Sequence, residues 1–536
     1  MKAQLVNLLY ALGDHRNQIV IAYFCLAALS WQYWRKICPI FMSAVLIRTA
    51  VLLAVLTISA YIFVLAFYLL YPNYFDHSQP VVASISWLWM QGHELYPNWT
   101  IGDVYSSVYG PLIFLINGLA LLLSPSIFAS KLPGVLALGA ALAATSILLK
   151  RTTGSILTSI LLLGSLVLLF ERFGVSAYWN RPEPFLILVS VLALLIASRP
   201  PSLVAGVGIG VLAGVAAGLK LTGFIYLAPA AAAFLARLET LHNRLVVAII
   251  GSLCAAASAL LPYLERGVSI DGYLRFLRVV LHQGWSEFLF VQTLLFVFSI
   301  STLMIVIWIW RPPALNPSDR WLLVALGLSA ATVTMIAGKT GAGSTHLLPL
   351  VPISIYGIAV IICAASKVVA KEIAALIFVS FFCAYAPNVL LDMWWSKYLY
   401  QVAAPSEREK ITELKTYLDS YPEAQIGVSD REHYSSYFYR VLSVWDGRPL
   451  HVDFSVWMDL AYIGVDEENI MRFIKECALP TWILPLGTPF THPNFYGGLP
   501  LFSESFRQTF LANYRQIEIG QAFQVWRCNT KLSPHY

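Results

Sequence analysis

Apolar runs of membrane length dominate the first 391 residues of the sequence. A helix needs roughly 20 apolar residues to cross the hydrocarbon core of a bilayer, and residues 47–71 form a clear first run of this kind. Of the 536 residues, 58% are hydrophobic and 12% are charged. The sequence therefore predicts a polytopic α-helical membrane protein. From residue 183 onward, eight more spans are expected near 183–198, 202–219, 222–237, 244–263, 286–310, 320–338, 346–366 and 372–391.

The number of crossings depends on three apolar runs between residues 109 and 183. These runs cover 110–124, 127–149 and 154–170. Residues 109 and 183 are both expected on the outer side of the membrane, so the number of crossings between them must be even. The run 110–124 is short and opens with Gly110 and Pro111, so we predict that it is not a full span. The total is then eleven crossings in a range of about 11–13, and residues 19–34 are expected to lie at the membrane interface.

Positive charges in the loops predict the orientation in the membrane, because short cytoplasmic loops are enriched in Lys and Arg. Arg35, Lys36 and Arg48 precede the first span, so its exit is expected on the outer side. The later basic residues fit inner loops if residue 183 and the C-terminal tail both lie outside. These residues are Lys150, Arg151, Arg199, Arg237, Arg244, Arg311, Arg320, Lys367 and Lys371. We therefore predict a multi-pass protein of the plasma (inner) membrane.

The character of the sequence changes near residue 395, after which charges, turns and short alternating segments replace the membrane-length runs. We predict a membrane domain over 1–394, with a first outer loop at 72–109, and a periplasmic or extracellular α/β domain over 395–536. In this second domain, SEREKITELKTYLDSY and DEENIMRFIKEC are typical of helices, AQIGVSD and TWILPLG of short strands, and YRQIEIGQAFQVWRC of a hairpin. Cys477 and Cys528 both fall here, and the sequence leaves open whether they form a disulfide.

The charge distribution argues against a nucleic-acid partner. The formal net charge of +6 is small for this length, and Lys and Arg are spread over many loops without a basic arm. The N-terminal segment has scattered charges and no small-residue cleavage site, which is not the pattern of a removable signal peptide. We expect the first hydrophobic helices to direct insertion themselves.

One carboxylate, Asp76, lies just beyond the first span in the segment YPNYFDHSQPVV. The stretch that follows, PVVASISWLWMQGHELYP, offers a Trp-rich apolar surface that includes Val81, Val82, Ile85 and Leu88. Such a surface suits the headgroup region of a bilayer. A helix lying along the membrane would hold Asp76 at the lipid–water boundary, where a lipid-linked substrate presents its head group. A solvated loop acid is the alternative interpretation.

The order of several segments resembles one known superfamily. After the first span and the outward acid come YGPLIFLINGLALLL, SKLPGVLALGAAL, RPEPFLILVSVLALL, GLKLTGFIYLAP and STHLLPLVP. This order, over roughly residues 45–366, resembles the GT-C glycosyltransferases, and within them the branch of protein O-mannosyltransferases and lipid A aminoarabinose transferases. The resemblance implies a GT-C fold. It also implies sugar transfer from a polyprenyl phosphate carrier on the outer face of the membrane, with inversion at the anomeric carbon.

The resemblance assigns two acids. An acceptor hydroxyl must lose a proton as it attacks the anomeric carbon, so a general base is required, and Asp76 matches the family's catalytic acid. The family's adjacent second acid is replaced here by His77, which would orient the acceptor, assist a cation or lie inert on the surface. Glu183, in WNRPEPF, corresponds to the family's later outward acid. Its alternative role is to pair with Arg181 at a helix start, where an acid suits the helix dipole.

A departing phosphate needs fixed cations, and Lys or Arg at a membrane boundary is costly enough to indicate function. Lys220 is the strongest candidate, because apolar and small residues surround it; snorkelling from a span end is its alternative. Lys339 lies in a glycine-rich loop, and His346 matches a polar position that the family often keeps. Outer-side candidates also include Arg181, Arg275 and Arg278. Where relatives have Lys or His before two prolines, this chain has Tyr109, Gly110 and Pro111, so one expected contact is missing.

A divalent cation and a transport function are the open alternatives. Some superfamily members use a cation at the first-loop acid, but the candidate ligands here have no fixed helical spacing. They are Asp76, His77, His93, Glu94 and Asp103. A transporter or flippase for lipid-linked saccharides would need a polar path through the inner half of the membrane, and the inner halves of the predicted spans are nearly devoid of charge. The expected partners are the sugar donor, membrane lipids and an acceptor that is a lipid, a glycan or a protein.

Overall fold

The computed structural model describes residues 39–100, 102–310, 312–365, 369–430, 435–496 and 499–529, together with residues 20, 22–26 and 29–30. Half of the predicted interfacial stretch 19–34 lies outside the described residues. The same holds for Arg35, Lys36, Arg311 and Lys367 of the orientation argument. The described part of the chain is mostly helical, as the sequence predicts.

Seven helical segments of the described chain are long and apolar enough to cross a membrane. They are α3 (Pro39–Leu70), α6 (Ile127–Thr153), α11 (Leu241–Leu260) with η3 (Leu261–Leu264), α13 (Glu287–Trp310), α14 (Pro317–Ala337), η4 (Ser344–Leu350) with α15 (Val351–Ala365), and the run that starts with α16 (Ala370–Tyr398). Shorter apolar helices are α5 (Pro111–Leu121), α7 (Ile156–Glu171), α8 (Pro182–Ala197), α9 (Leu203–Leu219), and η2 (Leu221–Leu227) with α10 (Ala228–Ala236). Each of the eleven predicted crossings coincides with one of these segments, and the excluded run 110–124 contains only the 11-residue α5.

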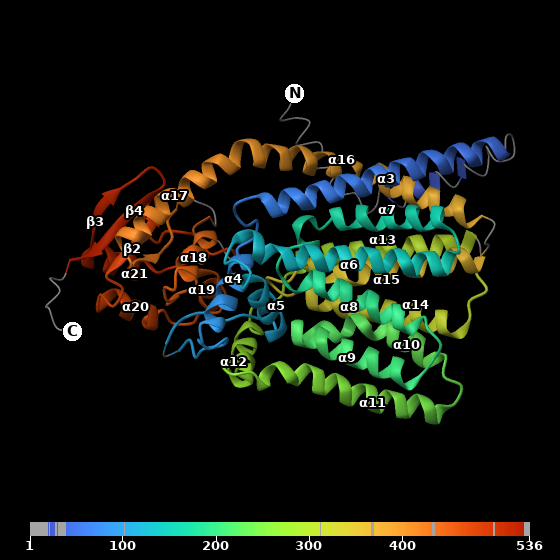
Figure 1. Cartoon of the computed structure of the whole chain (residues 1–536), viewed down its shortest axis with the longest axis horizontal. Coiled ribbons are helices and arrows are strands. Elements are labelled where there is room, and N and C mark those ends of the chain that lie inside the picture. The colour runs from blue at the N-terminus through green and yellow to red at the C-terminus, as the bar shows by residue number, and fades with distance from the viewer. Residues whose placement is uncertain are drawn as a thin grey trace. The chain divides into compact units, whose positions relative to one another are not determined.

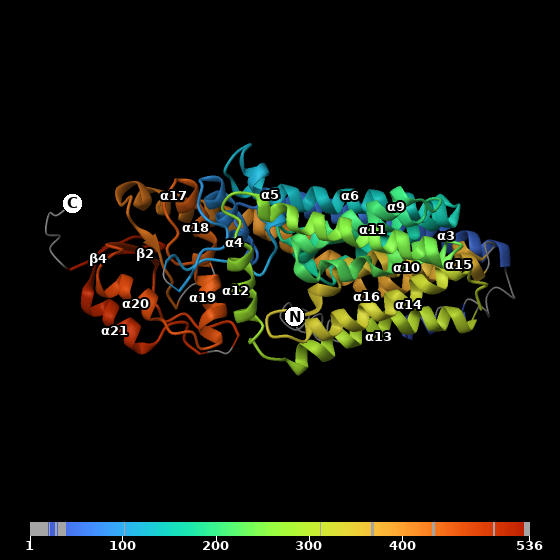
Figure 2. The same cartoon turned by 90° about the horizontal axis from the view of Figure 1, so that it is seen from below.

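The chain divides into two compact units. The first comprises the described residues of Met1–Leu69, Gly134–Leu260 and Trp285–Lys397, and the second those of Leu70–Pro133, Leu261–Gly284 and Tyr398–Tyr536. In the first unit α9 lies side by side with α11, and α13 with α14 (Figures 1 and 2). The helical run from α16 continues through η5 (Leu399–Ala403) into α17 (Ala404–Ser420), so the predicted domain boundary at 394 falls within a helix.

Helices α9 and α11 of the first unit pack backbone against backbone. A Cβ atom placed on Gly210 of α9 would lie 2.2 Å from the carbonyl oxygen of Gly251 on α11, far inside van der Waals contact. Small residues allow such close approach in membrane helices, where dispersion contacts replace the hydrophobic effect as the driving force. This packing fixes the position of α9, and with it the residue that follows the helix, Lys220.

The second unit contains a small mixed sheet. Its strands are β1 (Gln425–Ile426), β2 (Thr481–Pro485), β3 (Tyr514–Ile519) and β4 (Phe523–Cys528), in the order β1-β2-β4-β3. The pair β1 and β2 is parallel, and the other two pairs are antiparallel. Helices α17 and α21 (Glu504–Asn513) contact the sheet, and α20 (Glu468–Lys475) lies next to α21 (Figure 1). The predicted helices, strands and hairpin are all present; α18 (Ser435–Trp445), α19 (Phe454–Tyr462) and α21 are additional.

Helix α4 (Ser78–Met90) also belongs to the second unit, and its surroundings correct one prediction. The apolar side chains expected to face lipid head groups are buried within the protein, with Val82 and Ile85 at 0% exposure and Leu88 at 3%. They are buried because α4 packs against α5 and α18. The tryptophans Trp87 and Trp89 are only partly buried. Packing inside the protein therefore replaces the predicted lipid contact for most of this helix.

Cys477 and Cys528 form a disulfide, with their Cα atoms 6.1 Å apart. Cys477 follows α20 and Cys528 is the last residue of β4, so the bond ties the end of α20 to the end of an inner strand of the sheet. The structure thus answers the question that the sequence left open.

We expect Cys528→Ser to lower the free energy of unfolding of the second unit by about 2–4 kcal/mol, because the bond closes a long loop in the unfolded chain. The two cysteines are 51 residues apart. The effect is measured by thermal unfolding in detergent, with proteolysis of the C-terminal region as the readout of unfolding. Cys383→Ser, an exposed thiol on α16, is the control. Identical melting of the wild type with and without reductant would contradict the prediction.

Candidate functional site

Four of the residues predicted from the sequence meet in the first unit. The Glu183 carboxylate is contacted by Lys220, with 3.6 Å between Nζ and Oε1, and by Arg181, with 3.7 Å between Nε and Oε2. Lys220 Nζ lies 3.2 Å from His346 Nε2. These residues come from three separate segments of the chain, and we call them the basic cluster. It contains two cations, one carboxylate and one imidazole.

The start of α8 positions the acid of the cluster. Pro182 occupies the first helical turn, Arg181 is the residue before it, and Glu183 follows within the first turn. A carboxylate here is stabilised by the helix dipole. Trp179 Nε1 donates a 2.8 Å hydrogen bond to Glu183 Oε2, and the Arg181 guanidinium lies over the Trp179 ring at 3.8 Å. Glu183 is 1% exposed, so its charge needs the neighbouring cations.

A tight turn after α9 places Lys220. A Cβ atom on Gly223 would lie 2.1 Å from the carbonyl oxygen of Ala216, so glycine is needed for the chain to fold back at this point. The Lys220 side chain is 13% exposed. Its ammonium group contacts Glu183 and His346, whereas a snorkelling lysine would extend its charge into water. The contacts favour a role for Lys220 in a site.

The proton of His346 is placed by its neighbour. A lysine ammonium has only donors, so His346 Nε2 accepts from Lys220 and the proton of the neutral ring resides on Nδ1. This Nδ1 atom is buried and has no hydrogen-bond partner among the described residues. The Tyr226 hydroxyl donates to the His346 carbonyl oxygen at 2.8 Å and holds the start of η4. The cluster therefore offers an N–H donor in addition to its two cations.

The remaining predicted cations lie elsewhere. Lys339 lies in the turn between α14 and η4, where its backbone pairs with that of Trp285, and it is half-buried. In the second unit, α12 (Ile270–Val280) carries Arg275 and Arg278. Arg275 forms an exposed pair with Asp271 at 2.7 Å. The cluster of four is thus built without these three residues.

Asp76 and His77 form a separate group in the second unit. Asp76 Oδ1 accepts a 2.9 Å hydrogen bond from the Ser78 amide at the start of α4. Asp76 Oδ2 lies 3.7 Å from His77 Nδ1, and the two side chains are 23% and 18% exposed, respectively. One carboxylate oxygen is therefore held by the backbone, and the carboxylate stays partly exposed, so that a substrate hydroxyl can come within hydrogen-bond reach of it.

The described residues include no group of three or more His, Cys, Asp and Glu side chains able to hold a metal. Of the candidate ligands, His93 and Glu94 are exposed. Asp103 pairs with His451 at 2.7 Å between Oδ1 and Nδ1. The five candidate ligands therefore do not come together as one such group in the described part of the chain.

Two buried cations of the second unit were missed by the sequence analysis. Lys131, on α6, is 0% exposed and donates to the carbonyl oxygens of Tyr71 and Asn73 at 2.9 and 2.6 Å. Arg440, on α18, is 4% exposed and forms an ion pair with Asp453. Lys131 carried a usable signal, since it is a lone charge at the start of an apolar run. Arg440 carried none, because it lies in an ordinary amphipathic segment.

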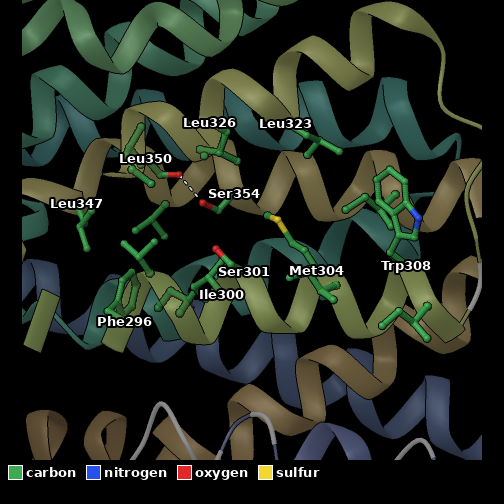
Figure 3. Close-up of a pocket in the computed structure, with 18 residues that line it drawn as sticks. Phe296, Ile300, Ser301, Met304, Trp308, Leu323, Leu326, Leu347, Leu350 and Ser354 are labelled. Carbon is green, nitrogen blue, oxygen red and sulfur yellow. Dashed lines mark hydrogen bonds between the residues drawn. The ribbon is translucent and has the colours of Figure 1, made fainter. Parts of the chain in front are cut away.

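An apolar pocket of about 450 Å³ lies among α13, α14, η4 and α15 in the first unit (Figure 3). Its lining includes Phe296, Ile300, Met304 and Trp308 on α13 and Leu326 on α14. Leu347, Leu350 and Ser354 line it from the segment that begins directly after His346. The same short segment therefore contributes to both the basic cluster and the apolar pocket.

No family model and no curated protein matches the sequence. Among solved structures, the crystal structure of ArnT from Cupriavidus metallidurans bound to undecaprenyl phosphate matches with a TM-score of 0.58 at 12% identity, covering 88% of this chain and 97% of that chain. The apo structure of the same ArnT matches with a TM-score of 0.56 at 13% identity and the same coverage. This chain has the ArnT fold. The ArnT fold is a GT-C fold, so the fold class predicted from the sequence is confirmed.

Proposed function

We propose that the protein is a membrane glycosyltransferase that moves a sugar from a polyprenyl-phosphate-linked donor to an acceptor on the outer face of the plasma (inner) membrane. The observation that carries this proposal is the pairing of the basic cluster with the apolar pocket in the first unit. His346 contributes to the cluster, and Leu347, the next residue, lines the pocket. A lipid phosphate needs both environments side by side.

The basic cluster supplies the electrostatics for the phosphate. Arg181 and Lys220 carry two positive charges against the single carboxylate of Glu183, and the neutral His346 adds a donor at Nδ1. The cluster keeps a net positive charge in a site largely shielded from water, where attraction to an anion is stronger than in solution. The sugar–phosphate bond places growing negative charge on the phosphate as it breaks, so fixed cations stabilise the transition state.

The apolar pocket suits the prenyl tail of the donor. Its lining is mostly hydrocarbon and sulfur, and the polar groups among the lining side chains are the hydroxyls of Ser301 and Ser354 and the indole N–H of Trp308. The Ser354 hydroxyl donates its proton to the carbonyl oxygen of Leu350. This proton is therefore not available for a hydrogen bond to a ligand. Undecaprenyl phosphate is bound in one of the ArnT structures that share this fold, and we transfer that ligand class to this chain as part of the proposal.

Asp76 is the proposed general base. The acceptor hydroxyl oxygen forms a bond to the anomeric carbon as the bond from that carbon to the phosphate oxygen breaks, and the hydroxyl proton passes to Asp76. The polyprenyl phosphate leaves with the electron pair of the broken bond. A single displacement of this kind inverts the anomeric carbon. Glu183, buried between Arg181 and Lys220, is the acid that orients the cations.

The proposed orientation places residues 72–109 and 395–536 outside the cytoplasm. The distribution of Lys and Arg over the loops supports it. The disulfide between Cys477 and Cys528 supports it as well, since such bonds persist in oxidising compartments and are rare in the cytosol.

Undecaprenyl phosphate should raise the melting temperature of the purified protein in detergent, because a ligand that binds only the folded state stabilises it by about 2.7 kcal/mol at 100 times its dissociation constant. Undecaprenol, which lacks the phosphate, is the matched control and should stabilise much less. Equal effects of the two lipids would contradict the proposed phosphate site. An assay of sugar transfer with the same preparation would then distinguish an enzyme from a transporter. An enzyme produces a glycosylated acceptor in detergent, and a transporter does not.

A further inference from the structure

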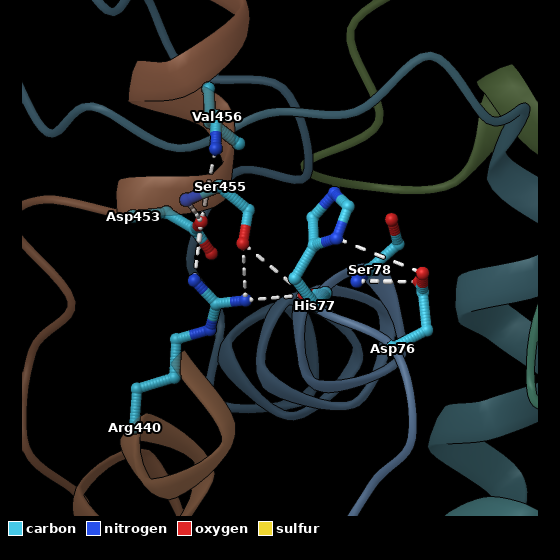
Figure 4. Close-up of polar contacts among 7 residues, drawn as sticks. All are labelled: Asp76, His77, Ser78, Arg440, Asp453, Ser455 and Val456. Carbon is cyan, nitrogen blue, oxygen red and sulfur yellow. Dashed lines mark hydrogen bonds and ion pairs between the residues drawn. The ribbon is translucent and has the colours of Figure 1, made fainter. Parts of the chain in front are cut away.

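The loop that carries Asp76 is held from the C-terminal part of the second unit. Arg440 NH2 donates a 3.0 Å hydrogen bond to the carbonyl oxygen of His77, and the Ser455 hydroxyl donates to the same oxygen at 3.2 Å. More than 360 residues separate these partners in the sequence. Figure 4 shows the guanidinium between the Asp453 carboxylate and the His77 carbonyl, with the Asp76 carboxylate on the far side of the same loop.

The Arg440 guanidinium is itself held in place by other residues of the C-terminal part of the second unit. Arg440 NH1 lies 2.5 Å from Asp453 Oδ1. That oxygen also accepts from the Ser455 and Val456 amides at the start of α19, at 2.9 and 3.1 Å. Arg440 NH2 donates to the Ser455 hydroxyl at 3.1 Å, which leaves the hydroxyl proton for His77. Burial lowers the pKa of Arg440, and the charge of Asp453 opposes this shift.

One peptide group connects this anchor to the acid. The carbonyl of His77 and the amide N–H of Ser78 belong to the same peptide bond, whose atoms lie in one plane. Arg440 and Ser455 bind its oxygen, and Asp76 Oδ1 binds its N–H at 2.9 Å. Fixing the oxygen fixes the direction of the N–H, and donation to the oxygen strengthens the N–H as a donor, because linked hydrogen bonds polarise one another.

The other flank of Asp76 is held independently. Lys131 donates to the carbonyl oxygens of Tyr71 and Asn73, and the Tyr74 hydroxyl contacts the Ser130 hydroxyl at 2.7 Å. The loop before Asp76 is therefore anchored to α6. Arg440 and Ser455 can therefore affect the orientation of the Asp76 carboxylate only through the His77–Ser78 peptide group that follows it.

We propose that Arg440 and Ser455 are positioning residues for Asp76, acting through the His77–Ser78 peptide, so that the C-terminal domain orients the general base. This inference rests on the proposed function. On this proposal, the C-terminal domain takes part in the reaction without contacting the substrate. Neither residue needs to touch the donor or the acceptor.

The test uses Ser455→Ala in the full-length protein, with Ser429→Ala as the matched control. Ser429 is equally buried in the same domain and its hydroxyl donates to the Leu486 carbonyl at 3.1 Å, remote in sequence from the Asp76 loop. Each variant loses one hydrogen bond from a serine to a carbonyl. Ser455→Ala also loses the bond that its hydroxyl accepts from Arg440. Hydrogen exchange of peptides spanning residues 71–82 and the kcat and KM of transfer are measured for both.

We expect Ser455→Ala to exchange faster in this peptide and to lose about two- to tenfold in kcat, the scale of one hydrogen bond, with KM for the donor unchanged. Ser455→Thr, which keeps the hydroxyl, should restore both values, and Arg440→Lys should lose more than Ser455→Ala. Exchange and kcat of Ser455→Ala equal to those of Ser429→Ala would overturn the proposal. Faster exchange at unchanged kcat would also overturn it.

Failure of the proposed function gives a different pattern. The wild type would then yield no glycosylated acceptor, so no variant would have a kcat to compare, and the positioning role would fall with the role of Asp76. The exchange difference between Ser455→Ala and Ser429→Ala would still be present in that case. The two failures are therefore distinguishable in one set of proteins.

Discussion

Asp76→Asn is expected to lower the rate of sugar transfer by about 10²–10⁴-fold, the usual contribution of a general base. The amide keeps the size of the side chain, and its oxygen still accepts the hydrogen bond from the Ser78 amide. It does not accept a proton from the acceptor hydroxyl at neutral pH. Packing of the loop should survive, so the melting temperature in detergent should stay close to that of the wild type while turnover is lost. Transfer from a synthetic polyprenyl phosphate donor measures the rate.

Asp103→Asn is the matched control for this experiment. Asp103 is another partly exposed acid of the segment 72–109, and its carboxylate pairs with His451 at 2.7 Å. We expect this variant to retain transfer, because nothing in the proposed reaction uses Asp103. Comparable activity of Asp76→Asn and Asp103→Asn would remove Asp76 from the mechanism. Its position would then be explained by the cap it provides to α4.

The membrane helices were predictable because one physical requirement dominates them. Backbone polar groups must be satisfied within each segment in lipid, so length and apolar composition alone locate helices. The run 110–124, which we predicted not to be a full span, contains a helix of 11 residues, α5, and this is well short of the roughly 20 residues that a crossing needs. The surroundings of α4 were not predictable, because Val82 and Ile85 present the same apolar face whether it meets lipid or α18.

The basic cluster was predictable in its members and not in its contacts. Lys220 was singled out by its apolar surroundings, where a charge is costly enough to need a partner. Glu183 and His346 were singled out by the family resemblance, and Arg181 as an outer-side cation. The sequence did not reveal that Lys220 bridges Glu183 and His346. That contact depends on how three separate helices pack.

Arg440 shows where sequence reasoning ends. Its segment has the pattern of any half-buried helix of a soluble domain, and its function depends on His77, which is 363 residues away in the chain. Only the folded structure brings the two together. A positioning residue that acts through a backbone carbonyl leaves no motif, because the carbonyl belongs to every residue type.

Lys220→Met should weaken binding of undecaprenyl phosphate by about 10–100-fold, since a hydrogen bond to a charged group contributes about 1.5–3 kcal/mol. Methionine keeps the length and apolar packing of the stem and removes the ammonium group. The affinity is measured in detergent by titration with the lipid. Lys150→Met is the control, because Lys150 is an exposed lysine in the last turn of α6 and should leave the affinity unchanged.

Loss of Lys220 also deprives the buried Glu183 of a cation 3.6 Å away, which threatens folding as well as binding. The double variant Glu183→Gln with Lys220→Met removes both charges and should recover the stability of the wild type more closely than Lys220→Met alone. If Lys220 binds the phosphate, the double variant still binds the lipid weakly although it is well folded. If Lys220 serves only to neutralise Glu183, the double variant recovers affinity together with stability, and the phosphate site must lie elsewhere.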